Sequence, residues 1–170
     1  MKIICYGASN TYGFDPRTYT GEPYARPWPS ILSEKLGLEA VNLGWPGRKI
    51  PETEAEIRSS INSIRSISSN DDLIIIMLGT NDLLSGRTPE ASILAMGKYL
   101  KALDGNTVLI GPPQIKGLET ELAEMNQGFE TLGVPWADSS TWNLEMAFDG
   151  IHMSEKDQYT FAEKIIELFF

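Results

Sequence analysis

The chain has 170 residues, of which 42% are hydrophobic and 22% are charged. This length predicts one domain over residues 1–170 with a sizeable core, and the composition excludes a disordered tail and a coiled coil. The 23 acidic and 14 basic residues give a net charge of -9, which disfavours nucleic acid and membrane as partners. One Cys and one His exclude a disulfide framework and any zinc site built from Cys and His.

The N-terminal apolar run is short. Residues 3–6 are apolar and end at Gly7, whereas a signal peptide needs roughly 7–15 apolar residues and a membrane-spanning helix about 20. We therefore expect a cytoplasmic protein. The sequence leaves open whether the chain forms a homo-oligomer.

Five short apolar runs predict the strands of a sheet. They lie at residues 3–6, 39–43, 73–78, 107–110 and 134–137. Apolar runs without alternation are typical of strands that are covered on both faces, as in a parallel sheet. Pro135 removes a backbone donor from the fifth run, which favours an edge position for that strand.

Amphipathic stretches between these runs predict helices. Ile57, Ile61 and Ile64 form one apolar stripe, Thr88 is a capping residue before a proline, and Ser154 opens the last helix. The expected helices cover residues near 29–36 and 53–66, a stretch from Thr88, residues 122–132, and a stretch from Ser154. Strands alternating with helices predict an α/β fold, a three-layer α/β/α sandwich. Residues 8–28 are expected to form a long loop, which in compact domains is often functional.

Polar groups follow each predicted strand at its carboxyl end, where open parallel sheets bind ligands. The segments are 7–13, 44–47, 79–82, 111–113 and 149–152. Together they bring a hydroxyl, backbone donors, an amide, a carboxylate and an imidazole to one edge of the sheet.

This set of groups fits acyl transfer. Ser9 is a weak nucleophile unless a base takes its proton, and His152 is the only imidazole in the chain. Asp149 lies three residues before His152 and is placed to orient its ring. The Asn81 amide and the backbone N–H groups of Ser9 and Gly44 are candidate donors for the oxyanion.

Four short blocks follow one another along nearly the whole chain: Gly7-x-Ser9-x-Thr11, Gly44, Gly79-Thr80-Asn81-Asp82 and Asp149-x-x-His152. In this order they resemble the four blocks of the SGNH (GDSL-type) hydrolases, a family of esterases, lipases, thioesterases, arylesterases and carbohydrate deacetylases. The resemblance implies a flavodoxin-like five-stranded parallel sheet in the order 2-1-3-4-5. It also implies a triad of Ser9, Asp149 and His152, with Ser9, Gly44 and Asn81 as oxyanion donors.

The first block departs from the usual pattern of this family, which reads Gly-Asp-Ser-Leu. Ala8 stands where an Asp is usual, and we expect that Asp to support the nucleophile loop. Asn10 replaces the usual Leu, so that a polar group lies beside Ser9 and either caps the next turn or faces the substrate. The loss of the Asp makes a catalytically weakened pseudoenzyme one alternative.

Several further residues have two interpretations. Asn10, Tyr12, Trp45 and Trp142 are candidates for substrate binding, and the aromatic residues among them are equally well explained as scattered packing. Asp82 is expected to close the third strand in an Asx-turn. Cys5, inside the first strand, is expected to be a buried, inert thiol.

The sequence thus predicts a serine esterase or acylhydrolase that needs no metal or organic cofactor. Its expected substrates are small acetyl or short acyl esters, acetylated carbohydrates included. A flavodoxin-like module that binds phosphate or flavin at residues 9–11 is the alternative. Against it, no cation lies between Lys2 and Arg17, and the first helix is expected to begin only after the long loop.

Overall fold

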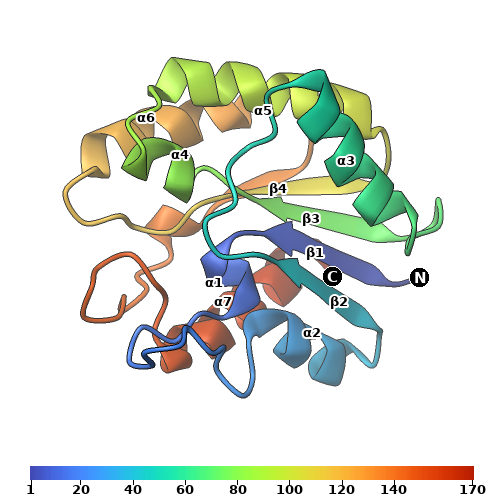
Figure 1. Ribbon diagram of the computed structural model, residues 1–170. Coiled ribbons are helices and arrows are strands. Elements are labelled where there is room, and N and C mark those ends of the chain that lie inside the picture. Colours follow the sequence, from blue (N-terminus) through green and yellow to red (C-terminus); the bar gives the residue numbers. More distant parts are fainter.

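The computed structural model describes residues 1–170 and contains one parallel sheet between two layers of helices (Figure 1). The strands are β1 (Ile3–Gly7), β2 (Ala40–Gly44), β3 (Leu73–Met77), β4 (Thr107–Gly111) and β5 (Trp136–Asp138). They lie in the order β2-β1-β3-β4-β5, and each pairs in parallel with its neighbours. The three-layer sandwich and the strand order are therefore confirmed.

Helices cover both faces of the sheet. They are α1 (Ser9–Tyr12), α2 (Trp28–Leu36), α3 (Glu54–Arg65), α4 (Thr80–Leu84), α5 (Pro89–Leu103), α6 (Glu119–Glu130) and α7 (Glu155–Phe169), with a short 3-10 turn η1 (Ser139–Thr141). Helices α2 and α7 pack on one face, whereas α3, α5 and α6 lie on the other (Figure 1). The two shortest helices, α1 and α4, follow the carboxyl ends of β1 and β3.

Helices α5 and α7 begin at the capping residues Thr88 and Ser154, as expected from the sequence. The Thr88 hydroxyl accepts the N–H of Ala91 at 3.2 Å. Thr53 and Ser154 each form a reciprocal capping box with the acidic residue three positions later. The expectation that residues 8–28 are entirely loop is wrong, because α1 begins at Ser9. A helix of four residues is too short to show a 3.6-residue period.

The hydrophobic core lies in two parts, one on each side of the sheet. Every residue of β1, β3 and β4 is buried, as their continuous apolar runs predict. Cys5 is fully buried, and burial raises the pKa of its thiol. Strand β5 pairs only with β4 and begins after Pro135, which confirms its edge position.

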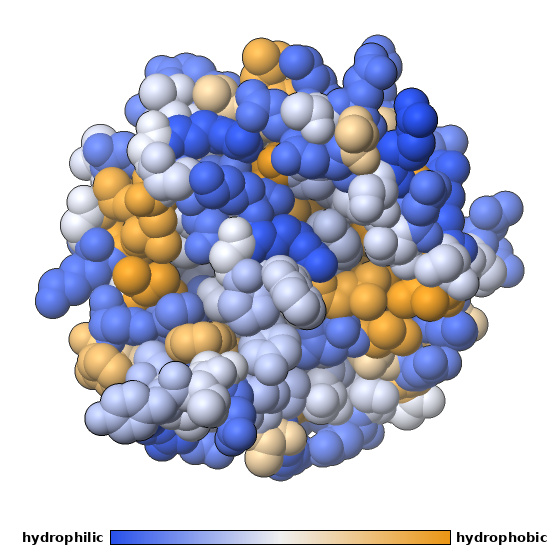
Figure 2. All heavy atoms as spheres, in the orientation of Figure 1, coloured by the Kyte–Doolittle hydropathy of each residue, from blue (hydrophilic) through white to orange (hydrophobic).

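The face seen in Figure 2 is mostly hydrophilic, with an apolar area over the β2 edge below α3. Val41, Leu43 and Ile57 pack against the core but are only partly buried, because β2 has a neighbour on one side only. None of the helices combines the length and the apolar character that crossing a lipid bilayer would require.

Candidate active site

Ser9 lies at the point where β1 turns into α1. It is the first residue of that helix, so its N–H has no acceptor within the helix. The turn depends on Gly7, because a Cβ there would lie 2.0 Å from the Thr11 hydroxyl and 2.8 Å from the Met77 carbonyl oxygen. The lack of a side chain at position 7 therefore lets α1 start directly at the carboxyl end of β1.

The side chains of Ser9, His152 and Asp149 form a continuous hydrogen-bonded chain. The His152 Nε2 atom lies 3.0 Å from the Ser9 Oγ atom, and the His152 Nδ1 atom lies 2.6 Å from Asp149 Oδ2. A carboxylate accepts a hydrogen bond, so it selects the tautomer that carries its proton on Nδ1. The Nε2 lone pair is then directed at the Ser9 hydroxyl. The fold thus brings together three side chains from opposite ends of the sequence.

Asp149 is held as a carboxylate. Burial raises the pKa of this group, but the hydrogen bond from the His152 ring and those from the backbone N–H groups outweigh burial and lower it. The other carboxylate oxygen, Oδ1, accepts the N–H groups of Ile151 and His152, both at 3.0 Å. These bonds fold the turn so that an acid three residues before the imidazole faces its ring.

Gly44 has a structural role that differs from the expected one. Its N–H donates to the side-chain oxygen of Asn42 at 2.8 Å, so it is not free for an oxyanion. A Cβ at Gly44 would lie 2.1 Å from the backbone nitrogen of Tyr12. The expectation that Gly44 is an oxyanion donor is therefore corrected: the glycine allows α1 to pack closely against β2.

Gly47, three residues later, offers a free backbone donor in the same loop. Its N–H has no acceptor in the protein, the residue is exposed, and its φ of 80° favours glycine. The Asn81 amide donates at 2.9 Å to the carbonyl of Arg48, the residue that follows Gly47, and retains a second N–H. The Gly-x-x-Gly spacing after β2 contains Gly47, but spacing alone does not distinguish which of the two glycines has a free N–H.

Arg48 holds this loop on the ends of two strands. Its guanidinium donates to the carbonyl of Gly7 at 2.8 Å and to that of Leu43, and lies 4.0 Å from the centre of the Tyr6 ring. Burial lowers the pKa of Arg48. A half-buried cation bound to carbonyls and to an aromatic face is a strong constraint on a loop. It therefore fixes the loop beside Gly7, two residues from Ser9.

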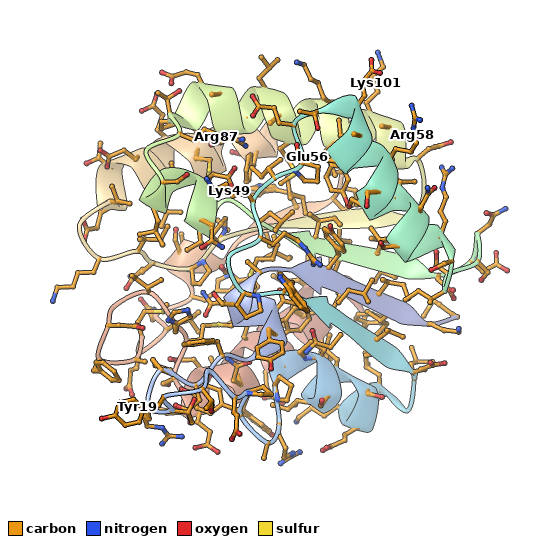
Figure 3. The ribbon with its side chains drawn as sticks, in the orientation of Figure 1. Tyr19, Lys49, Glu56, Arg58, Arg87 and Lys101 are labelled. Carbon is orange, nitrogen blue, oxygen red and sulfur yellow. The ribbon has the colours of Figure 1, made fainter.

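Asp82 does not form the expected Asx-turn. It lies within α4, is fully buried, and accepts the N–H of Ile50 at 3.1 Å and the guanidinium of Arg87 at 2.5 Å. Burial raises the pKa of Asp82, against the opposing effects of the Ile50 N–H and the Arg87 charge. Figure 3 shows Lys49 on the segment that leads into α3 and Arg87 beside that segment. Asn81 and Asp82 thus bind neighbouring parts of the loop between β2 and α3.

The comparison with family models decides the assignment. The model of the GDSL-like lipase/acylhydrolase family matches residues 5–156, which include all four blocks. This chain belongs to that family. A comparison with curated protein sequences gives no match.

Solved structures of similar fold agree with membership of the GDSL-like family. The aryl esterase of M. smegmatis matches with a TM-score of 0.80 at 22% identity, over 99% of each chain. A carbohydrate acetylesterase family member from Sinorhizobium meliloti matches with a TM-score of 0.81 at 19% identity, over 97% of this chain and 95% of that one. A G-D-S-L family member from Veillonella parvula has a TM-score of 0.80 at 23% identity, over 99% and 98%. At these identities the likeness shows the shared fold.

The substrate-binding candidates have different environments in this GDSL-like chain. Asn10 is buried and its amide binds backbone groups, which corrects the expectation that it faces the substrate or caps a turn. Trp142 packs on Phe161, with ring centroids 4.9 Å apart, and belongs to the core on the α2 and α7 side. Trp45 follows β2 and is 67% exposed, and Tyr12 ends α1 partly buried. Trp45 and Tyr12 stay predictions.

The aromatic residues of the 8–28 segment also divide into groups. Trp28 and Tyr24 are buried, whereas Tyr19 is fully exposed and projects from the molecule (Figure 3). Phe14 stacks on the ring of His152, with centroids 4.5 Å apart and planes 29° from parallel. This segment therefore contributes to the site through Phe14, whose contact with His152 no local sequence pattern indicates.

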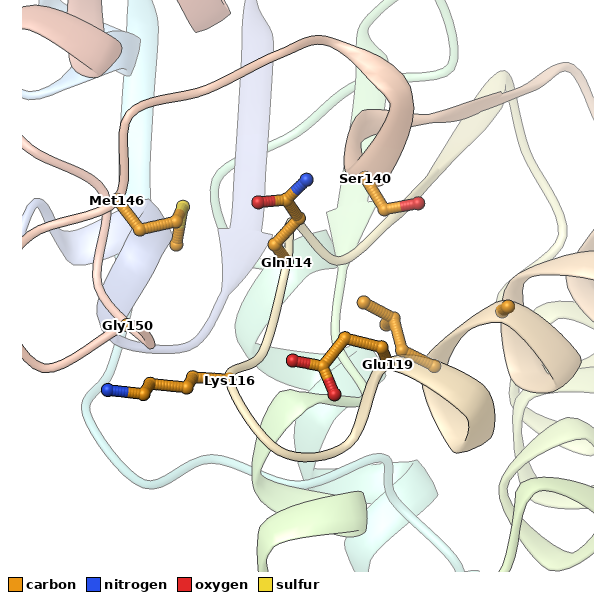
Figure 4. Close-up of a pocket in the computed structure, with 8 residues that line it drawn as sticks. Gln114, Lys116, Glu119, Ser140, Met146 and Gly150 are labelled. Atoms are coloured by element: carbon orange, nitrogen blue, oxygen red, sulfur yellow. The ribbon is translucent and has the colours of Figure 1, made fainter.

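A hollow of about 430 Å³ borders the turn that carries Asp149 and His152 (Figure 4). Gly150 and Met146 line it from that turn, and Gln114 and Lys116 line it from the segment after β4. The Lys116 N–H donates to the Gly150 carbonyl at 2.9 Å, which connects the two walls. The hollow is of a size that suits a small organic group.

One argument against the phosphate-binding alternative is wrong, because the first helix does not start late. Helix α1 begins two residues after β1. However, the Ser9 hydroxyl lies in contact with His152, and the chain belongs to the GDSL-like family. These findings favour the hydrolase interpretation over a flavin or phosphate module.

Proposed function

We propose that this protein is a serine esterase that hydrolyses small acetyl or short acyl esters through an acyl-enzyme on Ser9. The observation that carries the proposal is the 3.0 Å contact between Ser9 Oγ and His152 Nε2. This is the distance at which a base takes a proton from a nucleophile. Asp149, hydrogen-bonded to the other ring nitrogen, completes the arrangement.

In the first half of the reaction, the Ser9 oxygen attacks the ester carbonyl carbon while its proton moves to His152 Nε2. The carbonyl electron pair moves to its oxygen and forms a tetrahedral oxyanion. Collapse of this intermediate restores the C=O bond and breaks the bond to the leaving alcohol, which takes the proton from His152. The product at this point is acyl-Ser9 and a free alcohol.

In the second half, water repeats the cycle. His152 takes a proton from a water molecule as the water oxygen attacks the carbonyl carbon of the acyl-enzyme. The proton then passes to the Ser9 oxygen as the carboxylic acid leaves. Asp149 stabilises the imidazolium that forms in each half, because it remains ionised beside the ring. No redox step or external electron acceptor is involved.

The oxyanion needs donors that are already in place. We assign this role to the N–H groups of Ser9 and Gly47 and to the second N–H of the Asn81 amide. Two observations support the assignment. The free Gly47 N–H lies on the loop that Arg48 fixes beside Gly7, and the Asn81 amide is bonded to the Arg48 carbonyl of the same loop. Donors held by existing contacts need no rearrangement as charge develops.

The proposed substrates are small. The neighbours of similar fold include proteins named as an aryl esterase and as carbohydrate acetylesterases, and acetyl esters of phenols and of sugars are therefore the first candidates. The hollow beside Gly150 has room for a small acyl or alcohol group. The 8–28 segment lacks an insertion large enough to form a lid over the site. We therefore expect an open site and water-soluble ester substrates.

The test is hydrolysis of a panel of esters by the native protein and by Ser9→Ala. The panel contains p-nitrophenyl acetate, p-nitrophenyl esters of longer acids, and acetylated sugars. We expect turnover of the acetyl and short acyl esters and its near-complete loss in the folded variant. Equal turnover by both proteins would remove Ser9 from the mechanism. Much faster turnover of emulsified long-chain esters would contradict the proposed substrate class.

A further inference from the structure

The side-chain amide of Asn10 spans the backbone around His152. The Asn10 Oδ1 atom accepts the N–H of Met153 at 2.8 Å, and its Nδ2 atom donates to the carbonyl of Ile151 at 3.1 Å. These two peptide groups stand on either side of the only imidazole in the protein. A single amide therefore binds both flanks of His152.

Asn10 is well suited to this arrangement. It is 5% exposed and uses both ends of its amide, so that its burial leaves neither end unpaired. An amide has a donor and an acceptor side by side, as a peptide group does, and it can pair with a backbone N–H and a backbone carbonyl at once. Neither a carboxylate nor an aliphatic side chain offers that combination.

The remaining hydrogen bonds of the 146–153 turn do not reach the nucleophile helix. The N–H of Ala147 donates to the His152 carbonyl at 2.8 Å, and Gly150 is bound by Lys116 from the segment after β4. Apart from the contact between Ser9 and His152 themselves, the two Asn10 bonds are the hydrogen bonds that join α1 to this turn. Asn10 thus connects the peptide that follows Ser9 to the peptides on both sides of His152.

We propose that Asn10 is a positioning residue that holds the His152 imidazole in register with the Ser9 hydroxyl. This inference rests on the proposed esterase function. Because Asn10 directly follows Ser9 in the chain and its amide binds the backbone on both sides of His152 without contacting either reacting atom, it acts by fixing their separation. Misplacement of reacting groups by about 1 Å costs on the order of 10²-fold in rate.

The kinetic test compares Asn10→Ala with the native protein and with Tyr99→Phe. Tyr99 pairs with the hydroxyl of Ser60 at 2.5 Å in the core between α3 and α5, so this control loses a buried hydrogen bond elsewhere in the fold. For Asn10→Ala we expect kcat on p-nitrophenyl acetate to fall by on the order of 10²-fold, with KM within about twofold. For Tyr99→Phe we expect kcat within about twofold of native.

A second measurement reports the position of His152 without any substrate. Because the chain has one histidine, the imidazole gives a single set of ring signals in a heteronuclear NMR spectrum. We expect these signals to shift and broaden in Asn10→Ala and to stay unchanged in Tyr99→Phe. If Asn10→Ala does not fold, Asn10→Ser, whose shorter side chain can replace at most one of the two bonds, is expected to show the same changes at equal or smaller size.

The two measurements separate the inference from the esterase proposal. A native protein that hydrolyses no ester contradicts the proposed function, while the ring signals still test the role of Asn10. Unchanged ring signals and native kcat in the Asn10 variants would overturn the positioning role. An equal loss of kcat in Tyr99→Phe would also overturn it, because general loosening of the fold would then explain the effect.

Discussion

The ring of Phe14 lies against the imidazole of His152, with centroids 4.5 Å apart and planes 29° from parallel. The two residues come from the segment after α1 and from the turn before α7. An aromatic face restricts rotation of the imidazole and stabilises the positive charge that the ring carries during the proposed reaction. Phe14 and Asn10 therefore constrain His152 at its ring and at its backbone.

Replacement of Phe14 by Leu removes the aromatic face but keeps an apolar side chain. Contacts of this kind contribute about 0.5–1.5 kcal/mol, so we expect kcat to fall by about 2–10-fold. The measurement is steady-state hydrolysis of p-nitrophenyl acetate, with Phe14→Tyr as the control that retains the ring. The same loss in both variants would contradict a role for the aromatic face.

Replacement of Asn81 by Ala removes a proposed oxyanion donor and the bond to the Arg48 carbonyl. We expect kcat to fall by about 10²–10³-fold, the usual cost of one such donor. Asn81→Asp is the matched variant, because its carboxylate repels the oxyanion, and it is expected to be at least as slow. Near-native kcat in Asn81→Ala would contradict the assignment.

Replacement of Asp149 by Asn keeps the size of the side chain but removes its charge. The neutral amide favours the wrong imidazole tautomer, so we expect kcat to fall by on the order of 10⁴-fold, as at other triads of this kind. Labelling of Ser9 by a fluorophosphonate should slow in parallel. Rapid labelling with slow turnover would instead place the defect after the attack by Ser9.

The native protein and Asp149→Asn are also expected to differ in how their free energies of unfolding depend on pH. The pKa of Asp149 is lowered below its ordinary value of 3.8 in the fold, so the contribution of this carboxylate to the free energy of unfolding is fully present above that value. It is lost as the pH falls through the lowered pKa. The difference in unfolding free energy between the native protein and Asp149→Asn is therefore expected not to shrink between about pH 7 and about pH 5, and to shrink below 3.8. Chemical denaturation at each pH measures it, and a difference that shrinks above about pH 5 would contradict this prediction.

Asp82 is expected to be important for stability as well as for the site. Asp82→Ala leaves the Ile50 N–H without its acceptor and removes the buried partner of Arg87. Removing one partner of a buried charge pair costs about 3–5 kcal/mol. Denaturant unfolding measures this loss, with Glu52→Ala as the exposed control that removes the other partner of Arg87. A cost below about 1 kcal/mol for Asp82→Ala would show that this contact is dispensable.

The sequence predicted the sheet and the long helices because their signals are local. Continuous apolar runs identified every strand, and the capping residues Thr88 and Ser154 marked two helix starts that the structure confirms. Helices α1 and α4 were missed because each is shorter than two turns. The helical conformation of these two segments depends on neighbouring loops, and their sequences are too short to contain a helical period that would predict it.

At the site, residue type and spacing brought Ser9, Asp149 and His152 to notice, and the structure places them in contact. The roles of Asn10 and Gly44 were wrongly expected because each is decided by a hydrogen-bond partner. Asn10 bonds to residues more than 140 positions away, and the Gly44 N–H is occupied by Asn42. No local pattern in one sequence contains such pairings.

The central claim is that Ser9 is a nucleophile activated by His152. Mass spectrometry after exposure to a fluorophosphonate tests it most directly: the Ser9 oxygen attacks phosphorus, His152 takes its proton, and fluoride leaves. The account predicts one adduct per native chain, located on Ser9, and none in Ser9→Ala. An unlabelled native protein, or equal labelling of Ser9→Ala, would contradict it.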